Sequence, residues 1–246
     1  MTESFLTVDW PAPQHIHALT TTRHGGHSFP PFNTLNLGDH VGDDSAHVAK
    51  NRQTLIRTAE LPSAPLWLTQ THQTNVIHAK DWLPGITADA ITSELPQHVC
   101  AILTADCLPV LITNTAGTQV AAVHAGWRGL QAGIIEKTLI RFQSPATELL
   151  VWLGPAIGPD AFEVGPEVRA AFLAADEAAE TAFIPTQTGR FLADIYLLAR
   201  QRLSAQGITA IYGGNYCTVS QKELFFSYRR DGTTGRMATL IWMGNE

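Results

Sequence analysis

The chain has 246 residues, of which 45% are hydrophobic and 15% are charged, and its formal net charge is −6. This composition is typical of a folded protein with a large buried core, and it argues against a disordered chain. Because 16 Lys and Arg stand against 22 Asp and Glu, the chain lacks the basic excess that binds nucleic acid or an anionic membrane surface.

The beginning of the chain does not indicate export. Glu3 and Asp9 stand where a secretory signal would be basic, and no long apolar stretch follows them. The stretch between Asp106 and Arg128 has no charged residue, but Pro109 and several polar residues interrupt it, which favours buried strands over a membrane span. The chain has three cysteines, without a CxxC spacing: Cys100, Cys107 and Cys217. We therefore expect a cytoplasmic protein without disulfides that neither spans a membrane nor binds nucleic acid.

Hydrophobic patterning predicts strands and helices that are mixed along the chain without a regular βαβ repeat. Strands are expected over residues 18–22, 65–69, 99–104, 110–112, 119–123, 149–152, 208–212 and 225–228. Helices are expected over residues 46–60, 130–142, 166–174 and 194–207. The last of these helices has one apolar face of period 3.6, which would pack on a sheet.

The final segment, residues 225–242, predicts two strands joined by a turn that contains glycine. No internal repeat, low-complexity tract or Gly-, Ser- or Pro-rich linker divides the chain. The sequence therefore predicts one domain over residues 1–246, of the α+β or mixed α/β class.

Three residues capable of binding a metal stand at breaks in the predicted elements. His124 follows the apolar run 119–123, Cys107 follows the strand expected over 99–104, and His72 lies just after an apolar segment. Zinc prefers imidazole nitrogen and thiolate sulfur, and a catalytic zinc has three protein ligands and keeps a fourth position for water. The set therefore predicts a zinc site whose ligands converge from separate strands.

The same residues also suit structural roles. A buried cysteine is usually a small apolar core residue, and a histidine at a strand end is usually a hydrogen-bonded structural group. Asp89 and Asp106 would orient a ligating imidazole in one interpretation, and would cap turns in the other. The residues alone leave these alternatives open.

Arg128 lies between Gly126 and Gly129, where a glycine-containing turn opens a helix. Exposed backbone N–H groups and a bidentate guanidinium at such a turn suit a phosphate group. The alternative is a turn whose arginine covers a carboxylate. The polar loop 22–28, which contains Arg23, either contacts a substrate or is simply exposed.

Eight blocks of the sequence together resemble one known family, and the resemblance spans nearly the whole chain. The blocks are TRHGG (22–26), LNLG (35–38), QTH (70–72), TADCLP (104–109), HAGWRG (124–129), LGPAIGP (153–159), FEV (162–164) and FSYRR (226–230). They resemble the laccase-domain family of purine nucleoside phosphorylases, formerly labelled multicopper polyphenol oxidases and also called peptidoglycan editing factors. The HAGWRG and TADC blocks together are the most specific part of this resemblance.

The resemblance implies layered mixed β-sheets flanked by helices, similar to the catalytic domain of a bacterial cysteine-dependent toxin deamidase. It also implies that His72, Cys107 and His124 hold one metal ion, either zinc or copper. The implied activity is phosphate-dependent cleavage of adenosine, inosine, guanosine and methylthioadenosine, together with deamination of adenosine. A purine nucleoside and phosphate would then be the small-molecule substrates.

In this hypothesis Cys107 and His124 act at the reacting centre, and Asp106 is the candidate that carries a proton. Arg128 would bind phosphate as the purine base departs. Further candidates for binding substrate or phosphate are Gly126, Gly129, Arg23 and Asn36.

Three other functions compete with this hypothesis. A cysteine hydrolase would use Cys107 as nucleophile and His124 as base, with a peptidoglycan precursor as the substrate that the editing-factor name suggests. A copper phenol oxidase would need further copper ions, yet the chain has a single His-x-His, at His15 and His17. The third competitor is a metal-binding scaffold without catalytic activity. The sequence does not define the oligomeric state.

Overall fold

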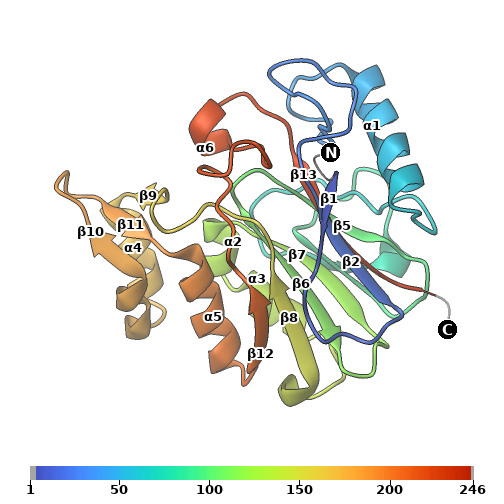
Figure 1. Ribbon diagram of the computed structural model, residues 1–246. Coiled ribbons are helices and arrows are strands. Elements are labelled where there is room, and N and C mark those ends of the chain that lie inside the picture. The colour runs from blue at the N-terminus through green and yellow to red at the C-terminus, as the bar shows by residue number, and fades with distance from the viewer. Residues whose placement is uncertain (1–3, 245–246) are drawn as a thin grey trace.

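The computed structural model describes residues 4–244, which are built around three β-sheets (Figure 1). The first sheet has four strands in the spatial order β1 (Phe5–Thr7), β2 (Ile16–Thr21), β13 (Met237–Met243) and β5 (Cys100–Thr104). The second has six, in the order β12 (Ala210–Gly213), β8 (Leu149–Leu153), β6 (Leu108–Asn114), β7 (Val120–Ala125), β4 (Ala90–Ser93) and β3 (Val76–His78). The third is small and contains β10 (Phe183–Pro185), β11 (Phe191–Ala193) and β9 (Glu163–Val164).

The four-stranded sheet is antiparallel, and the six-stranded sheet is mixed. The α-helices of the described residues are α1 (Ser45–Thr58), α2 (Trp127–Gln131), α3 (Ile134–Leu139), α4 (Pro166–Leu173), α5 (Ile195–Ala205) and α6 (Tyr228–Asp231). Short 3-10 helices are η1 (Ala79–Asp81), η2 (Ala146–Glu148) and η3 (Glu177–Ala182).

The two larger sheets pack face to face, and helices cover their outer faces (Figure 1). Apolar side chains from both sheets, such as Ile102 of β5 and Leu111 of β6, form the core between them. Leu55 of α1 packs on the outer face of the four-stranded sheet, whereas α3 and α5 cover the outer face of the six-stranded sheet. This order of helix, sheet, sheet and helices confirms the expected fold class of layered mixed sheets flanked by helices.

The alternation of side chains along a strand decides which groups meet between the two sheets. On β7, Ala122 faces the space between the sheets and Val123 faces the helices. His124 lies on the same face of the strand as Ala122, so its ring points between the sheets near the end of β7. Ile102 of β5 also faces this space, and Thr104, two residues later, follows it. The chain therefore brings His124 and Thr104 toward one end of the sandwich.

Most of the expected elements are present, with ends that differ by no more than two residues. The helix expected over 130–142 is instead two helices, α2 and α3, because Gly133 between them adopts a left-handed conformation with φ 91°. The strand expected over 65–69 is wrong, since only Leu66 and Thr69 form isolated bridges there. Short strands such as β3 and β4 were not expected, because they offer too few residues for a periodic pattern.

The hairpin expected over 225–242 is wrong in its first half. Phe225 and Phe226 are fully buried in a small apolar cluster with Ala105 and Met237, but they pair with no strand. The chain then forms α6, whose first turn is capped by the hydroxyl of Ser227. A run of aromatic residues has the same sequence pattern whether it forms a strand or is buried without strand pairing. The pattern alone therefore predicted a strand that is absent.

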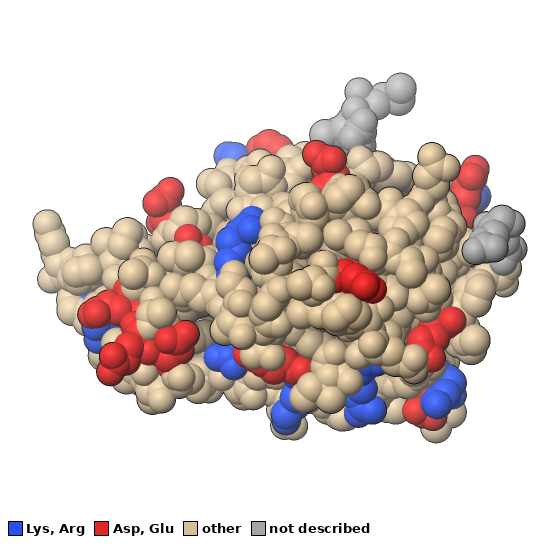
Figure 2. Space-filling model, turned by 90° about the horizontal axis from the view of Figure 1, so that it is seen from below, with Lys and Arg blue, Asp and Glu red and all other residues tan. Residues whose placement is uncertain are grey.

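The small sheet and α4 form a lobe beside the two larger sheets, at the left of Figure 1. On the face shown in Figure 2, acidic side chains gather on this lobe, whereas Lys and Arg lie scattered among neutral and acidic residues. No continuous basic patch forms on that face. Among residues 4–244, no helix combines the length and apolar character that crossing a membrane requires.

Candidate metal centre

The pairing of β6 with β7 brings Cys107 beside His124. Pro109 of β6 is paired with His124, and Leu108 with Ala125, so Cys107 lies just before the first residue of this ladder. Cys107 is partly buried, whereas the His124 side chain is only 3% exposed. The hydrogen bonds between the strands therefore fix these two side chains relative to each other.

His72 comes from a loop that folds around the carboxylate of Asp89. Asp89 Oδ1 accepts a hydrogen bond from the backbone N–H of His72 at 2.9 Å and lies 2.8 Å from Nδ1 of His124. Its other oxygen accepts from the backbone N–H of Gln73 at 2.9 Å, and both oxygens accept from Thr71. One fully buried carboxylate thus holds the loop and orients the ring of His124. The structure supports both interpretations of Asp89, because the same carboxylate caps the turn at residues 71–73 and contacts the ring of His124.

His72, Cys107 and His124 form a cluster whose ligand atoms all lie within 4.8 Å of one another. Sγ of Cys107 is 3.7 Å from Nε2 of His72, and the centroids of the two imidazole rings are 4.7 Å apart. Gly126 packs against this cluster. A β-carbon at that position would lie 3.0 Å from Sγ of Cys107 and 3.0 Å from Cδ2 of His72.

The cluster fits a zinc ion in donor type and spacing. Ligands bound at about 2.0–2.3 Å around a tetrahedral zinc are separated by roughly 3.5 Å, so only small side-chain movements would close this set around an ion. Nδ1 of His124 faces Asp89, so Nε2 is the nitrogen free to bind. His72 is exposed, so the cluster opens on that side toward solvent and substrate. Two imidazoles and one thiolate also suit copper.

Without a bound ion, Cys107 and His124 shift each other's pKa values. Burial by itself would raise the pKa of the Cys107 thiol, but hydrogen bonds and charge interactions with His124 and His72 outweigh it and lower this pKa to about 6. Burial would lower the pKa of His124, but hydrogen bonds to Asp89 and Cys107 raise it to about 9. The metal-free cluster at neutral pH is therefore a thiolate beside an imidazolium.

Alkylation of the metal-free protein with iodoacetamide tests this charge state. The rate at Cys107 should rise through about pH 6 and then stay nearly level to pH 8, because only the thiolate reacts. Site-resolved mass spectrometry gives the rate, and Cys100 is the internal control, since burial raises its pKa to about 12. A midpoint near the ordinary thiol value of about 8.5 would contradict the charge pairing.

Two cavities meet at the cluster. The first, of about 320 Å³, is here named the Trp127 cavity; it is lined by His72, Ala105, Asp106, Cys107, Trp127, Arg128, Ile157, Phe162, Ile195, Tyr228 and Arg229. The second, of about 380 Å³, is named the Arg236 cavity; it is lined by His40, Gln70, His72, Leu103, Thr104, Ala105, Cys107, His124, Tyr228 and Arg236. Because both include His72 and Cys107, the cluster can act on molecules bound in either cavity.

The structure places two expected residues, Arg128 and Asp106, in the Trp127 cavity. Arg128 is exposed, and its guanidinium lies 4.4 Å from the centroid of the Trp127 ring. The carboxylate of Asp106 accepts hydrogen bonds of 2.6 Å from the hydroxyl of Thr218 and from the backbone N–H of Arg229. Asp106 therefore faces the cavity but contacts neither histidine of the cluster.

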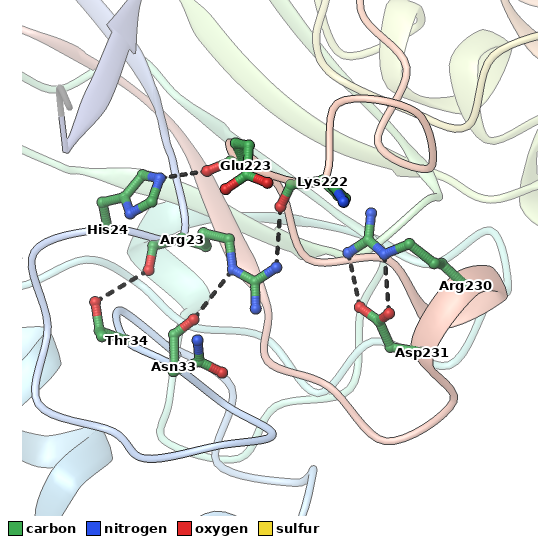
Figure 3. A pocket seen from close by; sticks show the side chains of 8 residues that line it. All are labelled: Arg23, His24, Asn33, Thr34, Lys222, Glu223, Arg230 and Asp231. Atoms are coloured by element: carbon green, nitrogen blue, oxygen red, sulfur yellow. Dashed lines mark hydrogen bonds and ion pairs between the residues drawn. The ribbon is translucent and has the colours of Figure 1, made fainter.

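The structure does not bring the other substrate-binding candidates, Arg23 and Asn36, to the cluster. Arg23 lines a separate cavity of about 370 Å³, where it donates to the carbonyls of Asn33 and Lys222 (Figure 3). Asn36 is fully buried and lines no cavity at the cluster, because its amide bonds Gly38 and Asp43. Gly129 is held close to the carbonyl of residue 73, which leaves no room for a side chain.

A family model for a multi-copper polyphenol oxidoreductase laccase matches residues 17–244. The chain belongs to this laccase family. Similar relatives named purine nucleoside phosphorylase come from Pseudomonas aeruginosa, 54% identical over 98% of both chains, and from Haemophilus influenzae, 51% identical over 95% of this chain and 97% of that one. A similar protein of Escherichia coli, also named purine nucleoside phosphorylase, is 54% identical over 95% of this chain and 96% of that one.

Crystal structures of related proteins have the same fold. A protein of Neisseria meningitidis is 48% identical, with a TM-score of 0.95, and the match covers 99% of this chain and 100% of that one. YlmD of Geobacillus stearothermophilus is 28% identical, with a TM-score of 0.90 over 100% of this chain and 98% of that one. The resemblance inferred from the sequence blocks is therefore confirmed at the level of the laccase family.

The laccase family name points to several copper ions, but the described residues contain one group of three or more potential ligands, the cluster itself. His15 and His17 do not join it, since His15 bonds the carbonyl of Gly117 and the ring of His17 stacks on Trp242. Sequence reasoning gave no role to Arg236, which directly precedes β13, or to Gln70 of the QTH block, whose side chain bonds the backbone of Leu103 in β5; both line the Arg236 cavity. Tyr228 was quoted in the FSYRR block without a role, although it lines both cavities.

Proposed function

We propose that the protein is a zinc-dependent purine nucleoside phosphorylase that also deaminates adenosine and cleaves methylthioadenosine. The observation that carries this proposal is the junction of a His2Cys donor set with a cavity of aromatic and cationic residues. Relatives at 51–54% identity over nearly the whole chain bear the name purine nucleoside phosphorylase. Copper is the alternative metal, since the donor set accepts both ions.

The Trp127 cavity suits a purine nucleoside. The rings of Trp127, Phe162 and Tyr228 offer flat apolar surfaces, and Ile157 and Ile195 add apolar contacts. Its volume of about 320 Å³ lies within the range of small-molecule sites. A base held among these rings would place its sugar or its exocyclic group beside Cys107 and His72, which line the same cavity.

Asp106 is the residue proposed to move a proton in this cavity. Its carboxylate is held by Thr218 and by the backbone of Arg229, so its position is fixed before a substrate arrives. A departing purine must gain a proton, and deamination also requires proton transfer at the exocyclic nitrogen. Asp106 lines the cavity where either group would lie.

His72, Cys107 and His124 would hold the metal. When bound, zinc would supply Lewis acidity toward the departing base and would activate water at neutral pH. The chain itself supplies the orientation, since Asp89 fixes the tautomer of His124 through Nδ1 and Gly126 leaves room for the three ligands. Phosphate would attack the sugar carbon as the base leaves, and the chain offers Arg128 and Arg236 near the cluster as cations for it.

Chelation with metal add-back tests the proposed activity. Base release from a panel of purine nucleosides should depend on phosphate, fall at least tenfold after treatment with a chelator, and return when zinc is added. Elemental analysis of the same samples gives the metal content, and copper add-back tests the alternative ion. Base release that needs no phosphate, or that persists in fully metal-free protein, would contradict the proposal.

A cysteine hydrolase is the second candidate, and the lowered pKa of Cys107 favours it. Cys107 would act as nucleophile and His124 as base, with a peptidoglycan precursor as the substrate. This enzyme would ignore the chelator and lose activity on alkylation of Cys107. Copper-dependent oxidation of phenols is not part of the proposal, because laccase chemistry needs ligand groups beyond the one cluster in residues 4–244.

We further propose that residues 1–246 act as one cytoplasmic domain. The family match over residues 17–244 and the shared core of the two large sheets support one domain. The three cysteines are free, which suits a reducing compartment.

A further inference from the structure

The Arg236 cavity contains a guanidinium with unused donors. Nη1 of Arg236 donates to the carbonyls of Thr234 and Gly235, both at 3.0 Å, whereas Nε and Nη2 make no hydrogen bond within residues 4–244. Over the same residues, no carboxylate forms an ion pair with Arg236, although Cys107 and Asp106 are near enough for their negative charges to influence it. The free edge of this guanidinium is thus available to an anion.

The backbone of Arg236 is held firmly in place. Its N–H donates to Oδ1 of the buried Asn36 at 2.9 Å, and its carbonyl accepts from the N–H of Leu37 at 3.2 Å. The guanidinium also lies 5.9 Å from the centroid of the Tyr228 ring. Asn36, expected to contact substrate, instead positions this arginine. A preorganised arginine loses little entropy when it binds a ligand.

A second, independent observation comes from Thr104 at the wall of the same cavity. Thr104 is 2% exposed, and its hydroxyl has no hydrogen-bond partner among the described residues. The hydroxyl of Thr234, which lines an adjoining cavity with Arg236, is also buried without a partner. A buried hydroxyl without a partner is costly, and Thr104 lines the cavity, so a polar ligand that reaches this hydroxyl would complete its hydrogen bonding.

We propose that the Arg236 cavity is the phosphate subsite, in which Arg236 and the hydroxyl of Thr104 bind the anion while the nucleoside occupies the Trp127 cavity. The identity of the anion rests on the proposed phosphorolysis. The two cavities share His72, Ala105, Cys107 and Tyr228, so phosphate and nucleoside would approach the cluster from separate chambers. The planar fork of an arginine matches two phosphate oxygens.

Arg128 is the competing phosphate ligand. It is exposed, and its guanidinium lies over the ring of Trp127 in the chamber assigned to the base. Its α2 helix has only five residues, and none of the unpartnered buried groups found in residues 4–244 lines the Trp127 cavity. Arg236 is partly buried and has such a group beside it.

Titration of the metal-replete protein with inorganic phosphate by calorimetry tests the assignment, with thermal unfolding as a second readout. Arg236→Gln should weaken phosphate binding at least tenfold, because a charge-assisted bidentate contact is lost. Arg128→Gln should weaken it less than threefold. Thr104→Val should weaken it about threefold to tenfold, while the unfolding temperature without phosphate stays the same or rises, since no protein bond is lost.

Thr239→Val is the matched control for Thr104→Val. The Thr239 hydroxyl on neighbouring β13 bonds that of Thr20 at 2.8 Å, so this variant should lower the unfolding temperature and leave phosphate affinity unchanged. If Arg236→Gln fails to fold, the phosphate affinity of Thr104→Val still tests the assignment of the subsite. The assignment is overturned if the wild type binds no phosphate at millimolar concentration, if Arg128→Gln has the larger effect, or if Thr104→Val leaves affinity unchanged.

The outcome also separates this assignment from the proposed function. Phosphate binding that depends on Arg236 and Thr104, without base release from any nucleoside, would support the subsite and refute the phosphorylase. Phosphate-dependent base release whose KM for phosphate is unchanged in Arg236→Gln and Thr104→Val would support the phosphorylase and refute the subsite.

Discussion

Replacing His72 by Ala is expected to remove the bound metal and nearly all phosphorolysis. His72 contributes one of three ligands, and its Nε2 lies 3.7 Å from the thiolate that would share the ion. Loss of a residue that merely orients a ligand costs roughly 10–100-fold in metal affinity or activity, so loss of a ligand itself should cost more. Elemental analysis and phosphate-dependent base release measure the two effects on the same preparation.

His47→Ala is the control for this experiment, because His47 lies on α1 and its ring contacts Phe29 outside the cluster. It should keep metal content and activity. A cysteine hydrolase built from Cys107 and His124 alone would tolerate the loss of His72. Retained turnover in the His72→Ala variant would therefore refute the metal mechanism and favour the hydrolase.

Replacing Asp89 by Asn is expected to weaken both the fold and the metal centre. The carboxylate accepts hydrogen bonds from three backbone N–H groups and contacts His124, whereas an amide would present its own N–H groups to some of these donors. Breaking one partner of a buried charged contact costs about 3–5 kcal/mol of unfolding free energy. Metal affinity should fall roughly 10–100-fold, since His124 loses the group that orients it.

Denaturant unfolding and competition with a metal indicator measure these two losses. Asp106→Asn is the matched control, because Asp106 bonds Thr218 and the backbone of Arg229 but contacts neither histidine. It should retain the metal and lose activity if Asp106 moves a proton. Equal metal affinity in the wild type and the Asp89→Asn variant would show that Asp89 does not orient His124.

Hydrophobic patterning predicted a mixed α and β class and most of the longer elements, whereas the layered arrangement of the sheets was implied by the family resemblance. Helix α1 has buried residues spaced three and four positions apart, strands β5 and β7 begin with unbroken apolar runs, and their expected ends lie close to those observed. Strands β3 and β4 have three and four residues, too few for periodicity to stand out. The turn at Gly133 was missed because a glycine within an apolar pattern predicts a break less strongly than Pro does.

The part of the candidate site that could be predicted consists of residue types that commonly bind metal ions. His72, Cys107 and His124 stand out as donors whatever their position in the chain, and the structure brings all three together. The residue types of Arg236 and Thr104 do not by themselves indicate a site. The two residues become neighbours only because β13 pairs with β5, which joins segments more than 130 residues apart in the sequence. Arg23 and Asn36 were chosen from conspicuous local blocks, and their hydrogen bonds within the protein explain them without a substrate.

Gly126 is required by the ligand cluster and not by the backbone conformation. Its φ of −59° and ψ of 154° are open to every amino acid, so the backbone itself sets no demand for glycine there. The demand comes from Cys107 and His72, whose side chains a β-carbon at this position would approach to 3.0 Å, so that both ligands would have to shift. A substitution at this position would therefore leave the fold intact and disturb the ligands on which activity depends.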